Sequence, residues 1–245
     1  MPSPIYWTLV HRSQVPPDRL KGFLSDPEFL KLSTLRFPKR RDEWLLGRWA
    51  AKCLVHSVPA YRQYALDEIQ IQNAPEGAPY IQPSGEAVSP DCLSISHSDP
   101  FALCALSSDP GIRIGVDLER IEPRPASFIE DYFTNAEQEL VSACPAERRM
   151  VLVNLIWSAK ESMLKALGVG LRRDTRSVEV HQVDGLLPGG HKWHKLDVRE
   201  AGAAQRSWAA WWQRRGDFVI TLAGFTTKQP GIQSTHLVEK KMQAG

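Results

Sequence analysis

The sequence predicts a mixed α+β protein made of two similar halves, and three observations lead to this prediction. Segments with helical periodicity and segments with strand alternation follow one another along the chain. Their order is alike in the two halves, and each half ends in a pair of strands. The 245 residues, 42% hydrophobic and 24% charged, match an ordinary globular composition and exclude a collagen-like or disordered chain.

The N-terminal half begins with a strand over residues 5–10, and a helix follows over residues 39–55. Apolar residues at helical spacing predict this helix, and Pro38 stands just before it, where proline is tolerated. Three cations, Lys39, Arg40 and Arg41, lie at the positive end of the helix dipole, which costs stability. They indicate either an anion-binding site or a solvated basic turn. Two further strands are predicted, over residues 92–96 and 101–106.

The C-terminal half begins with a strand over residues 112–119, in which apolar and polar side chains alternate strictly. The other elements expected are helices over residues 135–143 and 148–167, strands over 177–183 and 195–198, and a hairpin of 208–213 with 218–223. A turn at Asp109-Pro110-Gly111 separates the halves. We therefore expect an N-terminal half over residues 1–111, a C-terminal half over 112–228, and a flexible polar tail over 229–245.

Charge and cysteine usage exclude several classes of protein. Thirty Lys and Arg residues against 28 Asp and Glu leave a net charge of +2, so we expect no nucleic-acid partner. No apolar run approaches the roughly 18 residues of a membrane span, and the first ten residues lack the features of a signal peptide. The four cysteines lie far apart, which is typical of a reducing cytosol. The expected location is cytoplasmic, with no membrane partner.

The alternating strand carries two acidic residues that point to metal chemistry. Asp117 and Glu119 project from the same face, roughly 6.5–7 Å apart along the strand. Like charges at this distance repel each other unless a cation lies between them, and Mg²⁺ prefers carboxylate oxygens. The alternative interpretation is an ordinary solvent-facing strand edge.

The helix over residues 148–167 carries a second charged group. At about 100° per residue, Trp157, Lys160, Glu161 and Lys165 share one broad face. Glu161 and Lys165 could form a simple surface ion pair, or they could act beside a metal, where lysines neutralise phosphate charge. The sequence contains no G-x-S-x-G elbow, no Walker loop and no G-x-G-x-x-G.

The segments taken together indicate a function far more specifically than any one of them alone. In chain order they are Lys39-Arg40-Arg41 with Gly47-Arg48, then Ile95-Ser96-His97-Ser98, then residues 115–119, then residues 157–165. The arrangement closely resembles the Sfp-type 4′-phosphopantetheinyl transferases, whose hallmarks are G-[IV]-D-x-E and W-x-x-K-E-[SA]-x-x-K. Both hallmarks are complete here, and the similarity extends from about Phe37 to Ala223.

The resemblance implies both a fold and an activity. The fold would be a pseudo-dimer of two similar α/β halves with the active site between them. The enzyme, of the holo-[acyl-carrier-protein] synthase type, would transfer the phosphopantetheine arm of coenzyme A to a serine of an acyl or peptidyl carrier protein and release 3′,5′-ADP. We expect it to act as a monomer.

The resemblance also implies roles for individual residues. Mg²⁺, or Mn²⁺ in its place, would be held by Asp117, Glu119 and Glu161. The coenzyme A contacts would be Lys39, Arg40 and Arg48 at the nucleotide phosphates, Ser96 and His97, and Lys160 and Lys165 at the pyrophosphate. Glu161, directly or through a water, would be the base for the carrier serine, so the catalytic group is Glu161, Lys165 and Asp117. The acidic carrier would dock on residues 169–180, with Arg172, Arg173 and Arg176.

Two alternatives belong to other classes. A metal-dependent nuclease also uses clustered acids and a lysine, but such enzymes commonly place that lysine where this chain has Ile121. A non-catalytic binder of coenzyme A or of a carrier would have no reason to keep three acids that are costly without a metal. Both are less consistent with the sequence than the transferase.

Overall fold

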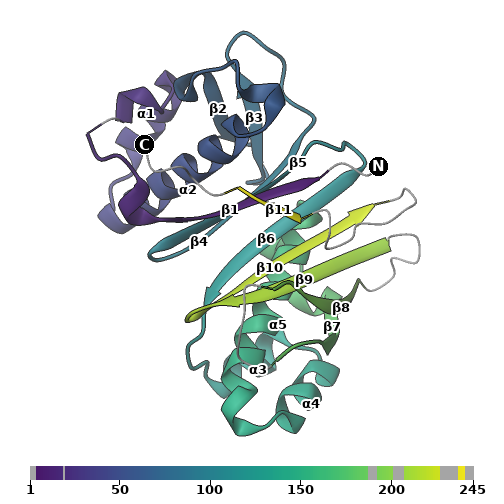
Figure 1. Ribbon diagram of the computed structural model, residues 1–245. Helices are drawn as coiled ribbons and strands as arrows, with labels where there is room; N and C mark the ends of the chain where they lie inside the picture. Colours follow the sequence, from purple (N-terminus) through teal and green to yellow (C-terminus); the bar gives the residue numbers. More distant parts are fainter. Residues whose placement is uncertain (1–3, 19, 187–191, 201–206, 227–236, 241–245) are drawn as a thin grey trace. The chain divides into compact units, whose positions relative to one another are not determined.

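Residues 4–18, 20–186, 192–200, 207–226 and 237–240 are described by the computed structural model, which divides into two compact units (Figure 1). Unit 1 contains the described residues up to 110 together with residues 237–240, and unit 2 contains residues 111–226. Each unit combines helices with mainly antiparallel strands, which confirms the predicted mixed α+β class.

Unit 1 is a four-stranded sheet with one long helix packed on it. The strand order is β11 (Leu237–Glu239), β1 (Ile5–His11), β5 (Phe101–Ser107) and β4 (Cys92–Ser98). The remaining elements are α1 (Asp26–Thr34), α2 (Pro38–His56) and the hairpin of β2 (Ile69–Asn73) with β3 (Pro79–Pro83). The predicted α2 has Pro38 in its first turn and buries Ala50, Leu54 and Val55 in the unit 1 core.

Unit 2 is a five-stranded antiparallel sheet covered by α5. The strand order is β6 (Ile112–Arg120), β10 (Phe218–Thr226), β9 (Ser207–Arg215), β8 (His194–Glu200) and β7 (Val178–Val183). The helices are α3 (Ala126–Tyr132), α4 (Asn135–Ala143) and α5 (Ala146–Ala166). Of these, α5 contacts mainly β6 and β10, and its apolar side chains form the core with Val219 and Ala223.

The two units follow the same plan of strand pairing, and the sequence predicted a similar order of elements in its two halves. In unit 1 β1 pairs with β5, and β5 then pairs with β4. In unit 2 β6 pairs with β10, and β10 pairs with β9. In chain order, the long helix of each unit follows the first strand and precedes a pair of antiparallel strands. This pair is β2–β3 after α2 and β7–β8 after α5.

Three elements of unit 1, the helix α1 and the strands β2 and β11, differ from the sequence-based expectation. Helix α1 was not predicted, although Ser25 and Glu28 form a capping box at its start. The tail expected to be flexible includes β11, which pairs in parallel with β1. There, the Thr8 hydroxyl donates to the carbonyl of Lys240 (2.7 Å), and the Lys240 N–H donates to Trp7 (2.8 Å). The physical reason is that without β11 the strand β1 would be a sheet edge with unpaired backbone N–H and C=O groups, and residues 237–240 supply partners for them.

In the described part of the chain, no helix has the length and apolar character needed to cross a membrane.

Candidate active site

The acidic motif lies on the face of β6 that meets α5, and a glycine makes this approach possible. A Cβ atom at Gly115 would lie 2.0 Å from the carbonyl oxygen of Ser162 and 2.6 Å from the backbone N of Ala166. Glycine therefore lets strand and helix come into backbone contact at this point. Asp117 and Glu119, two and four residues further along, share the face of Gly115 and lie against the helix rather than in open solvent.

Lys165 of α5 joins two carboxylates from different elements. Its ammonium donates to Asp117 Oδ1 at 2.6 Å and lies 3.5 Å from Glu161 Oε2, one helical turn away. The Asp117 side chain is 2% exposed and that of Glu161 17% exposed, so both carboxylates are shielded from bulk water. Burial lowers the pKa of Lys165, but the two carboxylates outweigh that effect, and the net pKa is raised.

Both carboxylate oxygens of Glu119 are held by donors from unit 2. Trp157 Nε1 donates to Oε1 (3.1 Å), and Arg124 donates to Oε2 (2.8 Å). Arg124 is itself fixed by Asn154, whose Oδ1 accepts from Arg124 Nε at 3.0 Å. Desolvation and the neighbouring Asp117 raise the pKa of Glu119 to about 7, and the same two causes raise the pKa of Glu161.

These carboxylates fit a hard divalent cation by their chemistry. Asp117, Glu119 and Glu161 supply only oxygen donors, and Mg²⁺ would neutralise the negative charge that they bring together. Burial first, and the neighbouring Asp117 second, raise the pKa values of Glu119 and Glu161. Lys165 and Arg124 partly compensate the negative charge in the structure. Among the described residues, no group of three or more His, Cys, Asp or Glu side chains is gathered closely enough to hold a metal ion.

Unit 1 contains a pocket of about 310 Å³ at the start of α2. Lys39 and His97, both predicted as coenzyme A contacts, line it together with Leu46 and Phe101. Arg12 also lines it and pairs with Asp42 (3.3 Å) and Asp99 (3.0 Å). Ser96 alternates with His97 along β4 and is buried, and Arg40 is exposed in the first turn of α2; neither is among the pocket-lining residues.

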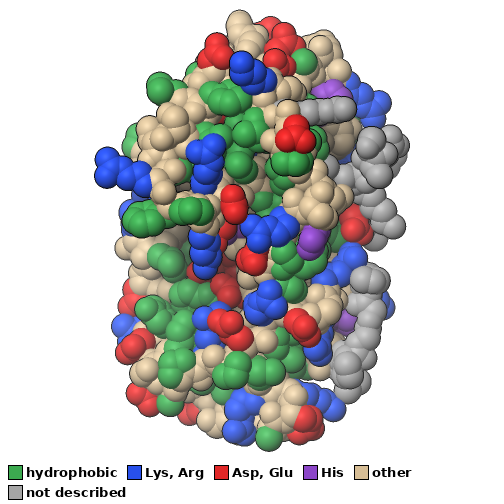
Figure 2. All heavy atoms as spheres, turned by 90° about the vertical axis from the view of Figure 1, so that its left-hand side faces the viewer, with side chains coloured by type: hydrophobic (Ala, Val, Ile, Leu, Met, Phe, Trp, Pro, Cys, Tyr) green, Lys and Arg blue, Asp and Glu red, His purple; other side chains and the backbone are tan. Residues whose placement is uncertain are grey.

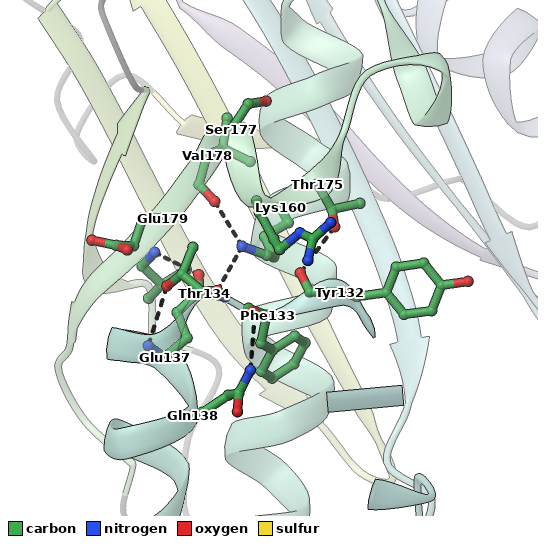
Figure 3. A network of polar contacts seen from close by, with 12 residues as sticks. Tyr132, Phe133, Thr134, Glu137, Gln138, Lys160, Thr175, Ser177, Val178 and Glu179 are labelled. Carbon is green, nitrogen blue, oxygen red and sulfur yellow. Dashed lines mark hydrogen bonds and ion pairs between the residues drawn. The ribbon is translucent and has the colours of Figure 1, made fainter. Parts of the chain in front are cut away.

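Two cations predicted to contact coenzyme A are buried in ion pairs instead. Arg48 is 6% exposed, donates to Asn73 Oδ1 (2.5 Å) and lies 4.0 Å from Glu28. Lys160 is fully buried and donates to Glu137 Oε2 and to the carbonyl of Val178, both at 2.6 Å (Figure 3). A phosphate could reach either cation only if these pairs opened, so we leave both out of the proposed substrate site.

The sequence did not reveal the residues that contact the predicted site residues or line the pocket beside them. Arg124 and Asn154 lie outside both motifs, and Arg12 lies far from α2 in sequence. Each acts through a tertiary contact with no local sequence pattern. The only available signal was the presence of Trp157 on the same helical face as Glu161, which indicated that this face is not simply solvated.

Comparison with known proteins defines the class to which this fold and site belong. The sequence pattern of the 4′-phosphopantetheinyl transferase superfamily matches residues 113–223. The 4′-phosphopantetheinyl transferase Sfp of Bacillus subtilis (strain 168) is 31% identical over 189 residues, covering 73% of this chain and 78% of the relative. Enterobactin synthase component D of Salmonella austin is 31% identical over 199 residues, covering 80% and 76%.

The chain thus belongs to the 4′-phosphopantetheinyl transferase superfamily, and phosphopantetheinyl transfer is its class of reaction. Among solved structures, a holo-(acyl-carrier-protein) synthase from Bacillus anthracis str. Ames in complex with CoA (3′,5′-ADP) is 23% identical. It covers 43% of this chain and 95% of its own, with a TM-score of 0.37.

Glu119→Gln should stabilise the metal-free protein at alkaline pH. The pKa of Glu119 in the folded protein, about 7, lies above its ordinary value of 4.5, so the stability contributed by its protonated form is lost as the pH rises from 4.5 through 7. Above pH 7 the charged carboxylate costs up to about 3 kcal/mol, at 1.36 kcal/mol per pKa unit. Glutamine removes that cost and keeps an acceptor for Trp157 or Arg124.

Urea unfolding in EDTA at pH 4.5 and at pH 8 measures this effect. The variant should gain stability at pH 8 and little at pH 4.5. An equal difference at both pH values would show that Glu119 does not titrate in this range.

Proposed function

We propose that this protein transfers the 4′-phosphopantetheine arm of coenzyme A to a serine hydroxyl of an acyl or peptidyl carrier protein, with Mg²⁺ and with release of 3′,5′-ADP. The observation that carries the proposal is the contact of Lys165 with Asp117 and Glu161, which joins the two family motifs on β6 and α5. Phosphoryl transfer depends mainly on positioning and charge neutralisation, which this group can supply.

In the proposed reaction, the serine oxygen forms a bond to the phosphorus that bears the pantetheine arm. The bond from that phosphorus to the bridging pyrophosphate oxygen breaks, and its electron pair leaves with 3′,5′-ADP. Glu161 takes the serine proton, and its raised pKa suits a base that works near neutral pH. Lys165 faces the growing negative charge of the leaving group. Asp117, Glu119 and Glu161 would hold Mg²⁺, which neutralises pyrophosphate charge when bound.

In unit 1 we assign the nucleotide phosphates to exposed cations at the start of α2. The Lys39 side chain is 84% exposed and lines the pocket with His97, so both can meet a ligand without breaking a buried contact. Arg40, in the same exposed turn, is a further candidate. Arg12 can join them only by leaving Asp42 or Asp99, both half-exposed, which costs little at the surface.

The face of the protein drawn in Figure 2 gives the nuclease alternative no support. On the face drawn in Figure 2, basic and acidic side chains are mixed among apolar ones, and its described residues form no continuous basic stripe. Nucleic-acid backbones are bound by such stripes.

The test is the intact mass of several apo carrier proteins after incubation with this protein, coenzyme A and Mg²⁺. A carrier that gains the mass of one phosphopantetheine group, and loses the gain in EDTA, supports the proposal. The range of carriers accepted would then define the substrate class. No gain on any carrier, combined with no binding of coenzyme A, would overturn it.

We further propose that the carrier docks near residues 169–180, where Leu171 is 60% exposed. Arg172 and Arg176 are exposed there, although Arg176 pairs with Asp174 at 3.2 Å. Arg173 pairs with the 5% exposed Glu200 (2.7 Å), so this arginine serves the fold as well. The charges available to an acidic partner are therefore mainly those of Arg172 and Arg176.

Reversing Arg172 and Arg176 to Glu should raise the KM for an acidic carrier about tenfold and leave the Kd for coenzyme A unchanged. Lys31→Glu with Arg62→Glu, two exposed reversals in unit 1, controls for the change of net charge. Steady-state transfer and calorimetric binding measure the two constants. If both constants worsen together, the docking surface lies elsewhere.

A further inference from the structure

The most deeply buried charges of unit 2 form a pair that ties three elements together (Figure 3). Glu137 of α4 and Lys160 of α5 are both fully buried, with Nζ and Oε2 2.6 Å apart. Glu137 Oε2 also accepts from the backbone N–H of Thr134, and Oε1 accepts from that of Val180 in β7 (2.8 Å). Lys160 donates a second bond to the carbonyl of Val178. The pair therefore connects the start of α4, the strand β7 and the middle of α5.

Unit 1 contains a buried Glu–Lys pair with the same kinds of backbone partners. Glu28 of α1 and Lys52 of α2 are 3% and 0% exposed, and their Oε2 and Nζ atoms lie 2.5 Å apart. Glu28 Oε2 accepts from the N–H of Ser25, and Oε1 accepts from that of Ile71 in β2 (3.1 Å). Lys52 also donates to a backbone carbonyl, that of Leu66. The glutamate and the strand N–H are 43 residues apart in both units.

The two pairs differ in the residues that come after the lysine along the helix. In α2, Lys52 precedes Cys53, whose thiol has a pKa raised to about 12 by burial. In α5, Lys160 precedes Glu161 and, five residues on, Lys165. Adjacent residues point about 100° apart around a helix, so the direction in which Lys160 is held fixes the direction of Glu161.

We propose that Glu137 and Lys160 are a positioning pair for phosphopantetheinyl transfer: they fix the rotation of α5, so that Glu161 and Lys165 face Asp117. This rests on the proposed function. It gives Lys160 a role without substrate contact, in place of the pyrophosphate contact predicted from its motif. Burial lowers the pKa of Lys160 more than Glu137 raises it, and the same holds for Lys52 beside Glu28, so the two lysines are in similar electrostatic environments.

Matched double substitutions separate positioning from stability. Glu137→Gln with Lys160→Met removes both charges of the unit 2 pair and keeps an acceptor for one of the two backbone N–H groups. Glu28→Gln with Lys52→Met does the same in unit 1. Removing both charges of a pair avoids leaving one of its two members buried and alone. In the unit 1 variant, the buried Arg48, 4.0 Å from Glu28, also loses its anionic partner. A third variant, Glu137→Asp, keeps the charge and shortens the link by one methylene, so it should fold even if the double variant does not.

The readouts are thermal unfolding, kcat and KM for transfer, and the Kd for coenzyme A. We expect both double variants to unfold cooperatively, with the larger loss of Tm in the unit 1 variant, because Arg48 loses its anionic partner there. The unit 2 variant and Glu137→Asp should lose at least about tenfold in kcat, with the Kd for coenzyme A within about twofold of the unaltered protein. The unit 1 variant should keep kcat within about threefold.

Different failures have different meanings. If the unaltered protein transfers phosphopantetheine and Glu137→Asp and the unit 2 double variant keep their kcat, positioning is overturned and the proposed function stands. If the unit 2 variant instead loses coenzyme A affinity while Glu137→Asp is unaffected, Lys160 contacts the substrate and positioning is again overturned. No transfer by the unaltered protein on any carrier overturns the proposed function and positioning together.

Discussion

Glu161→Gln should lower the rate of phosphopantetheine transfer by about 10³-fold or more while leaving the fold intact. Glutamine has nearly the same shape as glutamate but can neither take up the serine proton nor contribute negative charge for a metal, and loss of a general base alone costs 10²–10⁴-fold. The side chain is 17% exposed, and its ion pair with Lys165 is a contact of 3.5 Å, so little stability depends on its charge.

Single-turnover transfer followed by intact mass measures this rate. Glu147→Gln, at an exposed position in the first turn of the same helix, is the matched control and should transfer normally. A near-normal rate for Glu161→Gln at limiting Mg²⁺ would falsify the assignment of Glu161 as base and metal ligand.

Gly115→Ala should lower the free energy of unfolding by about 3 kcal/mol or more and lower the transfer rate with it. The added methyl group would lie 2.0 Å from the Ser162 carbonyl, which is backbone and cannot rotate away. The whole of α5 would have to move from β6, and overpacking of this kind costs 1–3 kcal/mol even where side chains can adjust. Because the movement separates Lys165 from Asp117, activity should fall further than the loss of folded protein explains.

Gly47→Ala in α2 is the matched control. A Cβ at Gly47 would meet only Ile95 Cγ2, at 3.5 Å, an ordinary contact. Within a helix, alanine is favoured over glycine by about 1 kcal/mol, so this variant should be as stable as the unaltered protein or more stable. Urea unfolding of both variants gives the comparison. Equal stability of the Gly115 and Gly47 variants would show that the contact between β6 and α5 is not tight.

The sequence predicted best those elements whose own periodicity determines them. The helices α2 and α5 and the strand β6 were expected within two residues of their observed bounds, because each buries one regular face. Helix α1 was missed because its buried residues are few and charged residues surround them; Glu28, its most important buried residue, is acidic. The strand β11 is three residues long and exists through pairing with β1, which no local pattern records.

From the sequence, we could predict which motif residues lie together when they are on facing elements. We could not predict which of them are turned into the core by a buried partner. Asp117, Glu161 and Lys165 meet because β6 and α5 are adjacent. The helical wheel placed Lys160 on the same broad face as Glu161, but only the buried Glu137, 23 residues earlier, turns it toward β7. The burial of Arg48 was not expected for the same reason, since its partner Glu28 comes from the helix that the sequence did not reveal.

The parallel pairing of β11 with β1 reverses the order in which the two units can be completed during synthesis. Domains generally fold as they emerge from the ribosome, with the N-terminal one first. Here the N-terminal unit lacks its edge strand until residues 237–239 have been made, whereas unit 2 has all its described strands once residue 226 has emerged. The nascent chain therefore carries the open edge of β1 through most of its translation, and chaperones or neighbouring nascent chains can pair with it during that time.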